Sequence, residues 1–349
     1  MVAQTQKPWR LALTFLLIGL ALLAGCGKPR PVLHLFTWED YLDPAIIAAF
    51  EREHGCRVVI DTFAANAAMF AKLSAGGSGY DLVLPTGYFA ELLEQQNLLQ
   101  PIDPAQLPNL HYLDQALIKR IALDPDMAYS VPYTITLIGL AARADRVDTA
   151  DPSWFMLGDP ALRQRTTVFD GYRAALGTAL LALGHDVNTL DESALDEAVA
   201  LFIRWRANAA MMDNSAFMHG LASGEFWLTQ GFDGDTLRVT LEDPQVVFLL
   251  PREGVIIGTD NWVIPRQARR PDLAHAFINY LCRPEVAAQN MAYTLFLMPN
   301  RKGIDQLPAA LKEHPGITAL LDGGKDFAVI RDLGENNALY LRAWEKIKR

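Results

Sequence analysis

The alternation of short apolar runs with helical segments between residues 32 and 96 limits the possible folds most strongly. The apolar or β-branched runs predict strands at 32–36, 57–63 and 81–84, and the segments between and after them predict helices at 44–54, 66–75 and 88–96. Asp43 and Pro44 are typical of a helix start, and Gly55 is typical of a helix end. Two consecutive strand–helix–strand units predict a parallel sheet with helices on both faces.

A second series of strands and helices follows residues 130–143 and predicts a second lobe. In it, 166–169, 225–232 and 255–264 are strand-like, Asp170 can cap a helix that runs to about residue 183, and 271–287 is helical. The 349 residues suffice for two domains of ordinary size. Because residues 130–143 are apolar and strand-like, we expect a hinge at which both lobes share chain segments.

Aromatic and polar side chains follow the first and third predicted strands. If the strand order is 2-1-3, the loops after these two strands flank the crevice at which open α/β sheets bind ligands. The first loop carries Trp38, Asp40 and Tyr41, and the second carries Thr86 and Tyr88. The sequence therefore predicts a binding site between these two loops.

Acids and rings recur at the later strand ends, at Asp170, Phe232, Asp233, Asp235 and Asp260. An ammonium group needs such surroundings, because burying it without a carboxylate is costly, and ring faces add cation–π attraction of roughly 2 kcal/mol when desolvated. Each residue also has a structural explanation: Asp170 can cap a helix, Trp38 and Phe232 can belong to the core, and the acids of 233–235 can form a turn. Together, these side chains favour a site for a small cationic ligand.

The first 26 residues predict an export signal. Lys7 and Arg10 precede an apolar stretch at 11–24 that is too short for a convincing membrane span. The stretch ends in Leu-Ala-Gly-Cys, which resembles the lipobox of bacterial lipoproteins and makes Cys26 the expected lipidation site. Residues 27–31 would then be the tether to a membrane. The alternative is a cysteine inside an ordinary signal peptide.

Several other classes of function have little support in the sequence. A net charge of −9 argues against a nucleic-acid partner. There is no G-x-S-x-G motif, no metal-binding histidine or cysteine spacing, and the glycine-rich segment 75–81 lacks the lysine of a phosphate loop. We therefore expect no catalytic residue, metal or cofactor. Cys56 and Cys282 remain, either as a disulfide or as two buried thiols.

Seven stretches, in order, resemble the bacterial spermidine/putrescine-binding proteins, the extracytoplasmic receptors of polyamine ABC importers. They are FTWEDYLDP (36–44), GYDLVLPTGYFAELL (79–93), YSVPY (129–133), LALGHDVNT (181–189), FDGD (232–235), GTDNWVIP (258–265) and FINYLCRPEVA (277–287). The resemblance implies an α/β, two-lobed periplasmic-binding-protein fold of type II, in which each lobe is a parallel-rich sheet flanked by helices and crossover strands form the hinge. Lobe 1 is expected at 32–136 and 260–303, and lobe 2 at 137–259 and 304–349.

The resemblance also implies which residues contact the ligand. The matching positions are Trp38, Asp40, Tyr41, Thr86, Tyr88, Phe232, Asp235, Asp260 and Phe296. Phe232 stands where the family usually has a tryptophan, and Phe296 falls near a tyrosine position. Asp170 and Arg173, both within VFDGYRAAL (168–176), are further candidates from the second lobe.

Two positions depart from the family pattern. Arg173 lies in a segment where the family has a carboxylate, usually glutamate, and Gly258 replaces a tryptophan. A charge swap about 4–6 Å from an ammonium would cost about 3–4 kcal/mol at an effective dielectric constant near 20. Arg173 can pair with Asp170 and point out of the cleft. Alternatively, it can bind a carboxylate of the ligand.

The sequence thus predicts a monomeric, lipid-anchored receptor in the periplasm or on the cell-envelope surface. It would close its two lobes over a polyamine such as putrescine or spermidine and deliver it to an ABC permease in the inner membrane. One alternative is a receptor for an amine that also carries a carboxylate. Another is a sensor or scaffold protein with a degenerate cleft.

Overall fold

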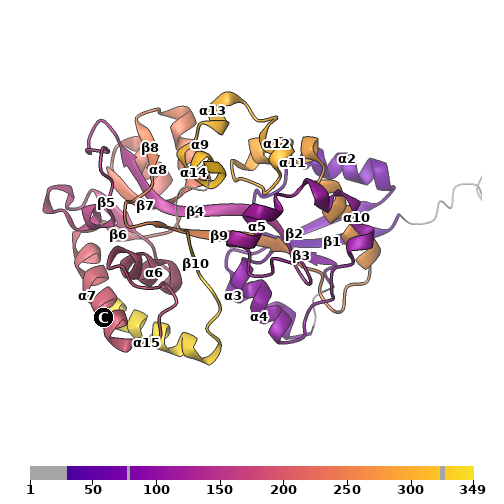
Figure 1. The fold of residues 1–349 in the computed structure, drawn as a ribbon, viewed down its shortest axis with the longest axis horizontal. Helices are drawn as coiled ribbons and strands as arrows, with labels where there is room; N and C mark the ends of the chain where they lie inside the picture. Colours follow the sequence, from indigo (N-terminus) through magenta and orange to yellow (C-terminus); the bar gives the residue numbers. More distant parts are fainter. Residues whose placement is uncertain (1–29, 77–78, 323–326) are drawn as a thin grey trace, which may run out of the picture.

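The computed structural model describes residues 30–76, 79–322 and 327–349 (Figure 1). A three-stranded parallel sheet contains β1 (Val32–Thr37), β2 (Arg57–Thr62) and β3 (Leu82–Val83) in the order β2-β1-β3. This order confirms the prediction that places the loops after β1 and β3 beside each other. In the register, Leu35 of β1 lies opposite Leu82 of β3.

The helices beside this sheet begin and end for local reasons. α2 (Pro44–His54) starts where the Asp43 carboxylate accepts the Ala45 N–H at 2.8 Å, and it stops at Gly55, whose φ of 60° suits glycine. α3 (Asn66–Ser74) and α4 (Gly87–Gln95) follow β2 and β3. All three helices were predicted within two residues of these bounds.

A second, mixed sheet has the order β10-β9-β4-β7-β5-β6, and β8 pairs with β4. Its strands are β4 (Val131–Arg143), β5 (Thr166–Val168), β6 (Met211–Met212), β7 (Leu228–Phe232), β8 (Val246–Leu249), β9 (Val255–Trp262) and β10 (Phe327–Val329). β4 runs antiparallel to β7, β8 and β9, whereas β5 is parallel to β6 and β7. The second sheet is therefore less uniformly parallel than the first.

The remaining helices cover the two sheets and their connections. They are α5 (Gln115–Ile121), α6 (Tyr172–Ala182), α7 (Glu192–Asn208), α8 (Phe217–Ser223), α9 (Asp233–Glu242), α10 (Pro271–Leu281), α11 (Pro284–Thr294), α12 (Arg301–Ile304), α13 (Ala309–Lys312), α14 (Pro315–Asp322) and α15 (Asn337–Lys348). Among the described residues, no helix is long and apolar enough to cross a membrane. Residues 1–29, including the expected export signal and Cys26, lie outside the described residues.

Two helix predictions need correction. The residue that caps α6 is Gly171 and not Asp170, since Gly171 has the extended backbone that precedes Tyr172. The segment 271–287 is not one helix, because α10 ends at Leu281 and a new helix begins at Pro284. Arg283 is extended (φ −63°, ψ 134°), as expected for a residue that precedes proline.

β4 and β9 connect the two halves of the molecule (Figure 1). They pair from Val131 with Trp262 to Ile138 with Ile256, and bridges at Val83–Val263 and Thr86–Asp260 attach the end of β9 to the first lobe. This antiparallel pair forms the predicted crossover hinge. It also brings the segment after β3 to the centre of the molecule.

Both described cysteines, Cys56 and Cys282, are buried free thiols. Burial raises the pKa of Cys282 to about 12, so this thiol is unreactive in the folded state. Of the two alternatives that the sequence left open, the structure therefore has unpaired thiols.

Gly139, on β4, offers a test of the central strand pairing. A Cβ atom at this position would lie 2.5 Å from the Phe248 ring and 2.7 Å from the Leu249 carbonyl oxygen. We expect G139A to lower the free energy of unfolding by about 1–3 kcal/mol in urea titrations. G171A is the control, because a Cβ there meets nothing within 4 Å, and it should cost about 1 kcal/mol or less. Equal losses for the two variants would contradict the close packing at Gly139.

Candidate functional site

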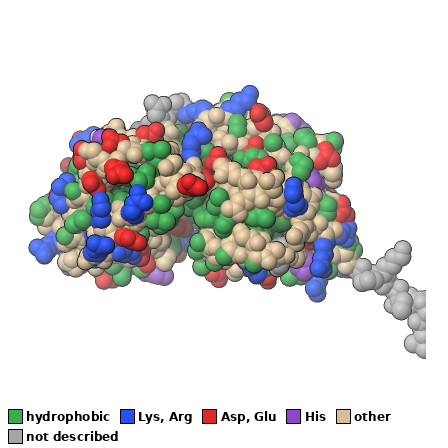
Figure 2. All heavy atoms as spheres, turned by 90° about the horizontal axis from the view of Figure 1, so that it is seen from below, with side chains coloured by type: hydrophobic (Ala, Val, Ile, Leu, Met, Phe, Trp, Pro, Cys, Tyr) green, Lys and Arg blue, Asp and Glu red, His purple; other side chains and the backbone are tan. Residues whose placement is uncertain are grey.

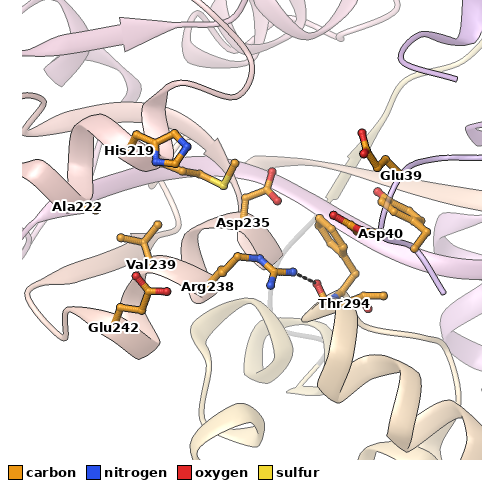
Figure 3. Close-up of a pocket in the computed structure, with 12 residues that line it drawn as sticks. Glu39, Asp40, His219, Ala222, Asp235, Arg238, Val239, Glu242 and Thr294 are labelled. Carbon is orange, nitrogen blue, oxygen red and sulfur yellow. Dashed lines mark hydrogen bonds between the residues drawn. The ribbon is translucent and has the colours of Figure 1, made fainter. Parts of the chain in front are cut away.

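Two cavities lie between the lobes. The larger, of about 450 Å³, is lined by Glu39, Asp40 and Tyr41 after β1 and by residues of α8, α9 and α11. In Figure 3, Asp235 and Arg238 come from one side, and Glu39 and Asp40 come from the other. We call this space the acidic chamber. Asp40 and Glu39 are exposed at its edge, and Asp40 has a φ of 56°.

Asp260 lies buried beside the acidic chamber, with only 3% of its surface exposed. Its Oδ2 atom accepts a hydrogen bond of 3.0 Å from the Thr134 hydroxyl on β4. Burial raises the pKa of Asp260 to about 7, and hydrogen bonding by Thr134, Tyr41 and Trp38 acts in the opposite direction. Trp38 Nε1 is itself buried and lacks a partner with full hydrogen-bond geometry among the described residues.

Asp233 and Asp235 open α9 and face the same region. Burial raises the pKa of Asp233 to about 7 although its Oδ1 atom accepts the Leu137 N–H at 2.9 Å, and burial raises the pKa of Asp235 to about 6. Burial and the nearby carboxylates of Asp260, Asp235 and Asp233, in that order, raise the pKa of Tyr41 far above its usual range. The Tyr41 hydroxyl therefore stays protonated among three carboxyl groups.

This acidic cluster, Asp233, Asp235 and Asp260, has little positive charge to balance it. Arg238, which is exposed, is the cation whose charge lowers the pKa of Asp235. None of the ion pairs among the described residues includes any of the three acids. Within the same part of the chain, no three potential metal ligands converge. The cluster is therefore suited to an organic cation that enters the cleft.

Aromatic rings surround the acidic cluster. The Tyr41 ring lies 5.4 Å from that of Phe296, and Trp38 lies 4.4 Å from Phe63 and 6.4 Å from Tyr41. Phe296 packs against the turn at Gly234, where an added Cβ would lie 2.6 Å from its ring. The segment after α11 thus contacts the start of α9 through Phe296, between Asp233 and Asp235.

The smaller cavity, of about 170 Å³, is mostly apolar, and we call it the apolar chamber. Thr86, Tyr88, Phe232, Gly258 and Arg173 are among its lining residues. Phe232 stacks on Phe169 at 5.0 Å. A Cβ on Gly258 would meet only the Thr136 hydroxyl, at 3.2 Å, so the absence of a side chain here leaves space in the chamber.

Arg173 and Asp170 do not pair with each other. Arg173 is buried in the wall of the apolar chamber, where its Nη2 atom donates to Asn188 Oδ1 at 2.7 Å and to the Arg331 carbonyl oxygen at 3.1 Å. Asp170 is exposed and binds Lys348 at 2.5 Å, because it precedes the N-cap and turns outward. The expectation that Arg173 points out of the cleft is wrong, and Asp170 lines neither chamber.

The structure brings most of the predicted residues to the cleft. Asp40, Tyr41, Asp235 and Phe296 line the acidic chamber, Thr86, Tyr88, Arg173 and Phe232 line the apolar one, and Trp38 and Asp260 lie behind Tyr41. Sequence reasoning missed Arg238, whose Nη2 atom reaches the Thr294 carbonyl oxygen at 3.4 Å (Figure 3). Its spacing, three residues after Asp235 on one helix, was the available signal.

One face of the molecule carries charges of both signs (Figure 2). In Figure 2, lysine and arginine side chains lie interspersed with aspartate and glutamate over both halves of the visible face. Two lobes, crossover strands and a polar interlobar cleft define the class of two-lobed ligand-binding proteins. The chain belongs to the bacterial extracellular solute-binding protein family, whose profile matches residues 45–319.

Within this family, the chain is similar to proteins that are named for binding polyamines. The putrescine/cadaverine-binding protein of Pseudomonas aeruginosa is 30% identical over 95% of this chain and 97% of its own length. The putrescine-binding periplasmic protein PotF of Escherichia coli is 29% identical over 91% of this chain and 92% of its own length. The structure of the TpPotD lipoprotein of Treponema pallidum matches with a TM-score of 0.82 and 31% identity, over 90% of this chain and 99% of that one.

The raised pKa values of the acidic cluster make the stability of the unliganded protein depend on pH. The folded protein retains protons that the unfolded chain, with aspartate pKa values near 3.8, has already released. These groups therefore contribute stability that is complete below about pH 4 and is lost as the pH rises to about 7.

The variant D260N isolates one of these groups. The free energy of unfolding of D260N minus that of wild type should be larger at pH 8 than at pH 5 by on the order of 2–3 kcal/mol, as measured by urea titration without ligand. D126N, at an exposed aspartate, is the control and should follow wild type at both pH values. A difference between D260N and wild type that is the same at both pH values would refute the buried, protonated state of Asp260.

Proposed function

We propose that this protein is the extracytoplasmic solute-binding component of an ABC importer for a small primary amine of the polyamine kind. The observation that carries the proposal is the acidic cluster beside Tyr41, which lacks an internal cation partner among the described residues. Its relatives include putrescine-binding, putrescine/cadaverine-binding and spermidine/putrescine-binding proteins, which supports the same ligand class. Binding would replace protons on these acids with a ligand ammonium.

Aromatic side chains of the cleft would contact the ligand. Tyr41 and Phe296 face the acidic chamber, and Phe232 continues the wall into the apolar chamber. Aromatic faces attract an ammonium and pack against methylene groups. Asp235 and Asp260 would hold the ammonium, while Asp233, which accepts the Leu137 N–H, would position the start of α9.

Closure would couple binding to transport. The cleft is lined from both lobes, with the loops after β1 and β3 on one side and α6 and α9 on the other. A ligand that touches both sides binds the closed form more tightly and so shifts the population toward it. The closed monomer would then engage the permease, without catalysing a reaction.

We also propose that Cys26 is lipidated and holds the protein at the membrane or cell-envelope surface. The lipobox-like segment that ends at Cys26 supports this, as does the similarity to a solved lipoprotein. The lobes would be residues 32–136 with 260–303 and 137–259 with 304–349, and residues 27–31 would form the tether.

Isothermal titration calorimetry tests the binding role. Wild type should bind at least one primary amine from a panel of alkylamines, diamines, triamines and amino acids with a Kd of about 10 μM or lower. D235N and D260N should each weaken that Kd by at least about tenfold, because each removes a charge-assisted contact with the ammonium. D126N should bind like wild type. If no amine binds to wild type, the proposed function is wrong.

A further inference from the structure

Arg173 is a buried charge that the amine-binding role leaves unexplained. Its side chain is 4% exposed, and it takes part in no ion pair among the described residues. The two N–H bonds of Nη2 are used by Asn188 and the Arg331 carbonyl. Nε and Nη1 are buried and have no acceptor with full hydrogen-bond geometry among the described residues, although Arg173 is close enough to the Tyr340 hydroxyl to act against the rise in the pKa of Tyr340. Such orphaned donors are rare and unfavourable, so they indicate a missing partner.

The guanidinium is held in one place by neutral groups. Asn188, its acceptor, is fixed in turn by donating to the Val329 carbonyl at 2.9 Å and by accepting the Arg331 N–H at 2.9 Å. The Tyr340 ring lies 4.2 Å from the Arg173 Cζ atom, and its hydroxyl donates to the carbonyls of Val187 and Thr189. The side chain is therefore oriented before a ligand arrives, and its charge is not neutralised.

The apolar chamber beside Arg173 contains no acidic side chain among its lining residues. Its walls are mainly aliphatic, with Ile256, Ile257 and Val329 among them. Tyr88 also lines the chamber, and burial raises its pKa, whereas the charge of the nearby Arg173 acts against this rise. Of the acidic cluster, Asp235 lines the acidic chamber. Phe232, three residues earlier, lines the apolar chamber, and Asp260 forms a backbone bridge with Thr86 of the apolar chamber. The cleft is thus negative at one end, apolar in between and positive at the other end.

From this polarity we infer that the ligand is an ω-amino acid, a primary amine joined through a methylene chain to a carboxylate. The carboxylate accepts from Nη1 or Nε of Arg173, the methylene groups lie along Phe232, and the ammonium enters the acidic cluster. The inference rests on the amine-binding part of the proposed function and replaces the second ammonium of a polyamine with a carboxylate. A diamine would place its second ammonium beside an uncompensated guanidinium, with no carboxylate in that chamber to bind it.

Calorimetry with matched ligands tests this directly. For chains of three to five methylene groups, each ω-amino acid is compared with the diamine and the simple alkylamine of similar length. Wild type should bind at least one ω-amino acid at least about tenfold more tightly than the corresponding alkylamine, because of the charge-assisted hydrogen bonds to Arg173. It should bind the diamine more weakly than the alkylamine, because of repulsion from Arg173.

Variants at Arg173 separate its charge from the rest of the site. R173Q should remove the advantage of the ω-amino acid and leave alkylamine affinity within about threefold of wild type. R173E should reverse the preference, so that the diamine binds about a hundredfold more tightly than the ω-amino acid. R204Q changes an exposed arginine of the same lobe and should keep the wild-type order. Circular dichroism identifies any variant that fails to fold, and the wild-type comparison stands without it.

The outcomes distinguish this inference from the proposed function. Diamine binding by wild type that equals or exceeds ω-amino acid binding overturns the inference and leaves the amine-binding role intact. The inference is also overturned if R173Q folds and keeps the wild-type ratio of ω-amino acid affinity to alkylamine affinity. Absence of binding by every amine, with or without a carboxylate, instead refutes the proposed function on which the inference rests.

Discussion

The antiparallel pairing of β4 with β9 is the interaction on which the rest of the structure depends. It joins the two lobes, and it brings Thr134 opposite Asp260 in the strand register. The same stretch of β4 supplies the Leu137 N–H to Asp233, and the end of β9 pairs with Thr86 of the first lobe. The hinge and the binding site therefore share the same segments of β4 and β9, so a change in the pairing of these strands also moves the acids of the site.

The acidic cluster shows how the binding site is maintained at a cost in stability. Asp233 and Asp260 are almost fully buried. Asp233 lies near Asp235 and accepts the Leu137 N–H, and Asp260 accepts from the Thr134 hydroxyl and lies beside Tyr41. An unliganded protein keeps such acids by protonating them, which is what the pKa values near 7 describe. A ligand ammonium is a better partner for these acids than a proton is. Part of the binding free energy therefore comes from pairing buried carboxylates that have no cation partner in the unliganded protein.

The sequence predicted the first lobe well because its signals are local. Alternating strand and helix patterns, the Asp43 cap and Gly55 defined β1 to α4, and the predicted order β2-β1-β3 placed the loops after β1 and β3 beside each other. The signals for Asp170 and Arg173 were ambiguous, because the outcome depends on distant partners. Lys348 draws Asp170 outward, and Asn188 with Tyr340 fixes Arg173 in the wall of the apolar chamber. The residues in these contacts are 15 to 178 positions apart in the sequence, so the local sequence pattern does not indicate them.

The central claim is that the ligand's ammonium displaces protons from buried carboxylates. Proton exchange can be measured by calorimetry of one binding amine near pH 6.5 in two buffers with different ionisation enthalpies. The difference between the two observed binding enthalpies, divided by the difference between the two ionisation enthalpies, gives the number of protons released. The acidic cluster predicts a net release on binding, because its raised pKa values fall when the cation arrives. Equal enthalpies in the two buffers, or net proton uptake, would contradict the role assigned to Asp235 and Asp260.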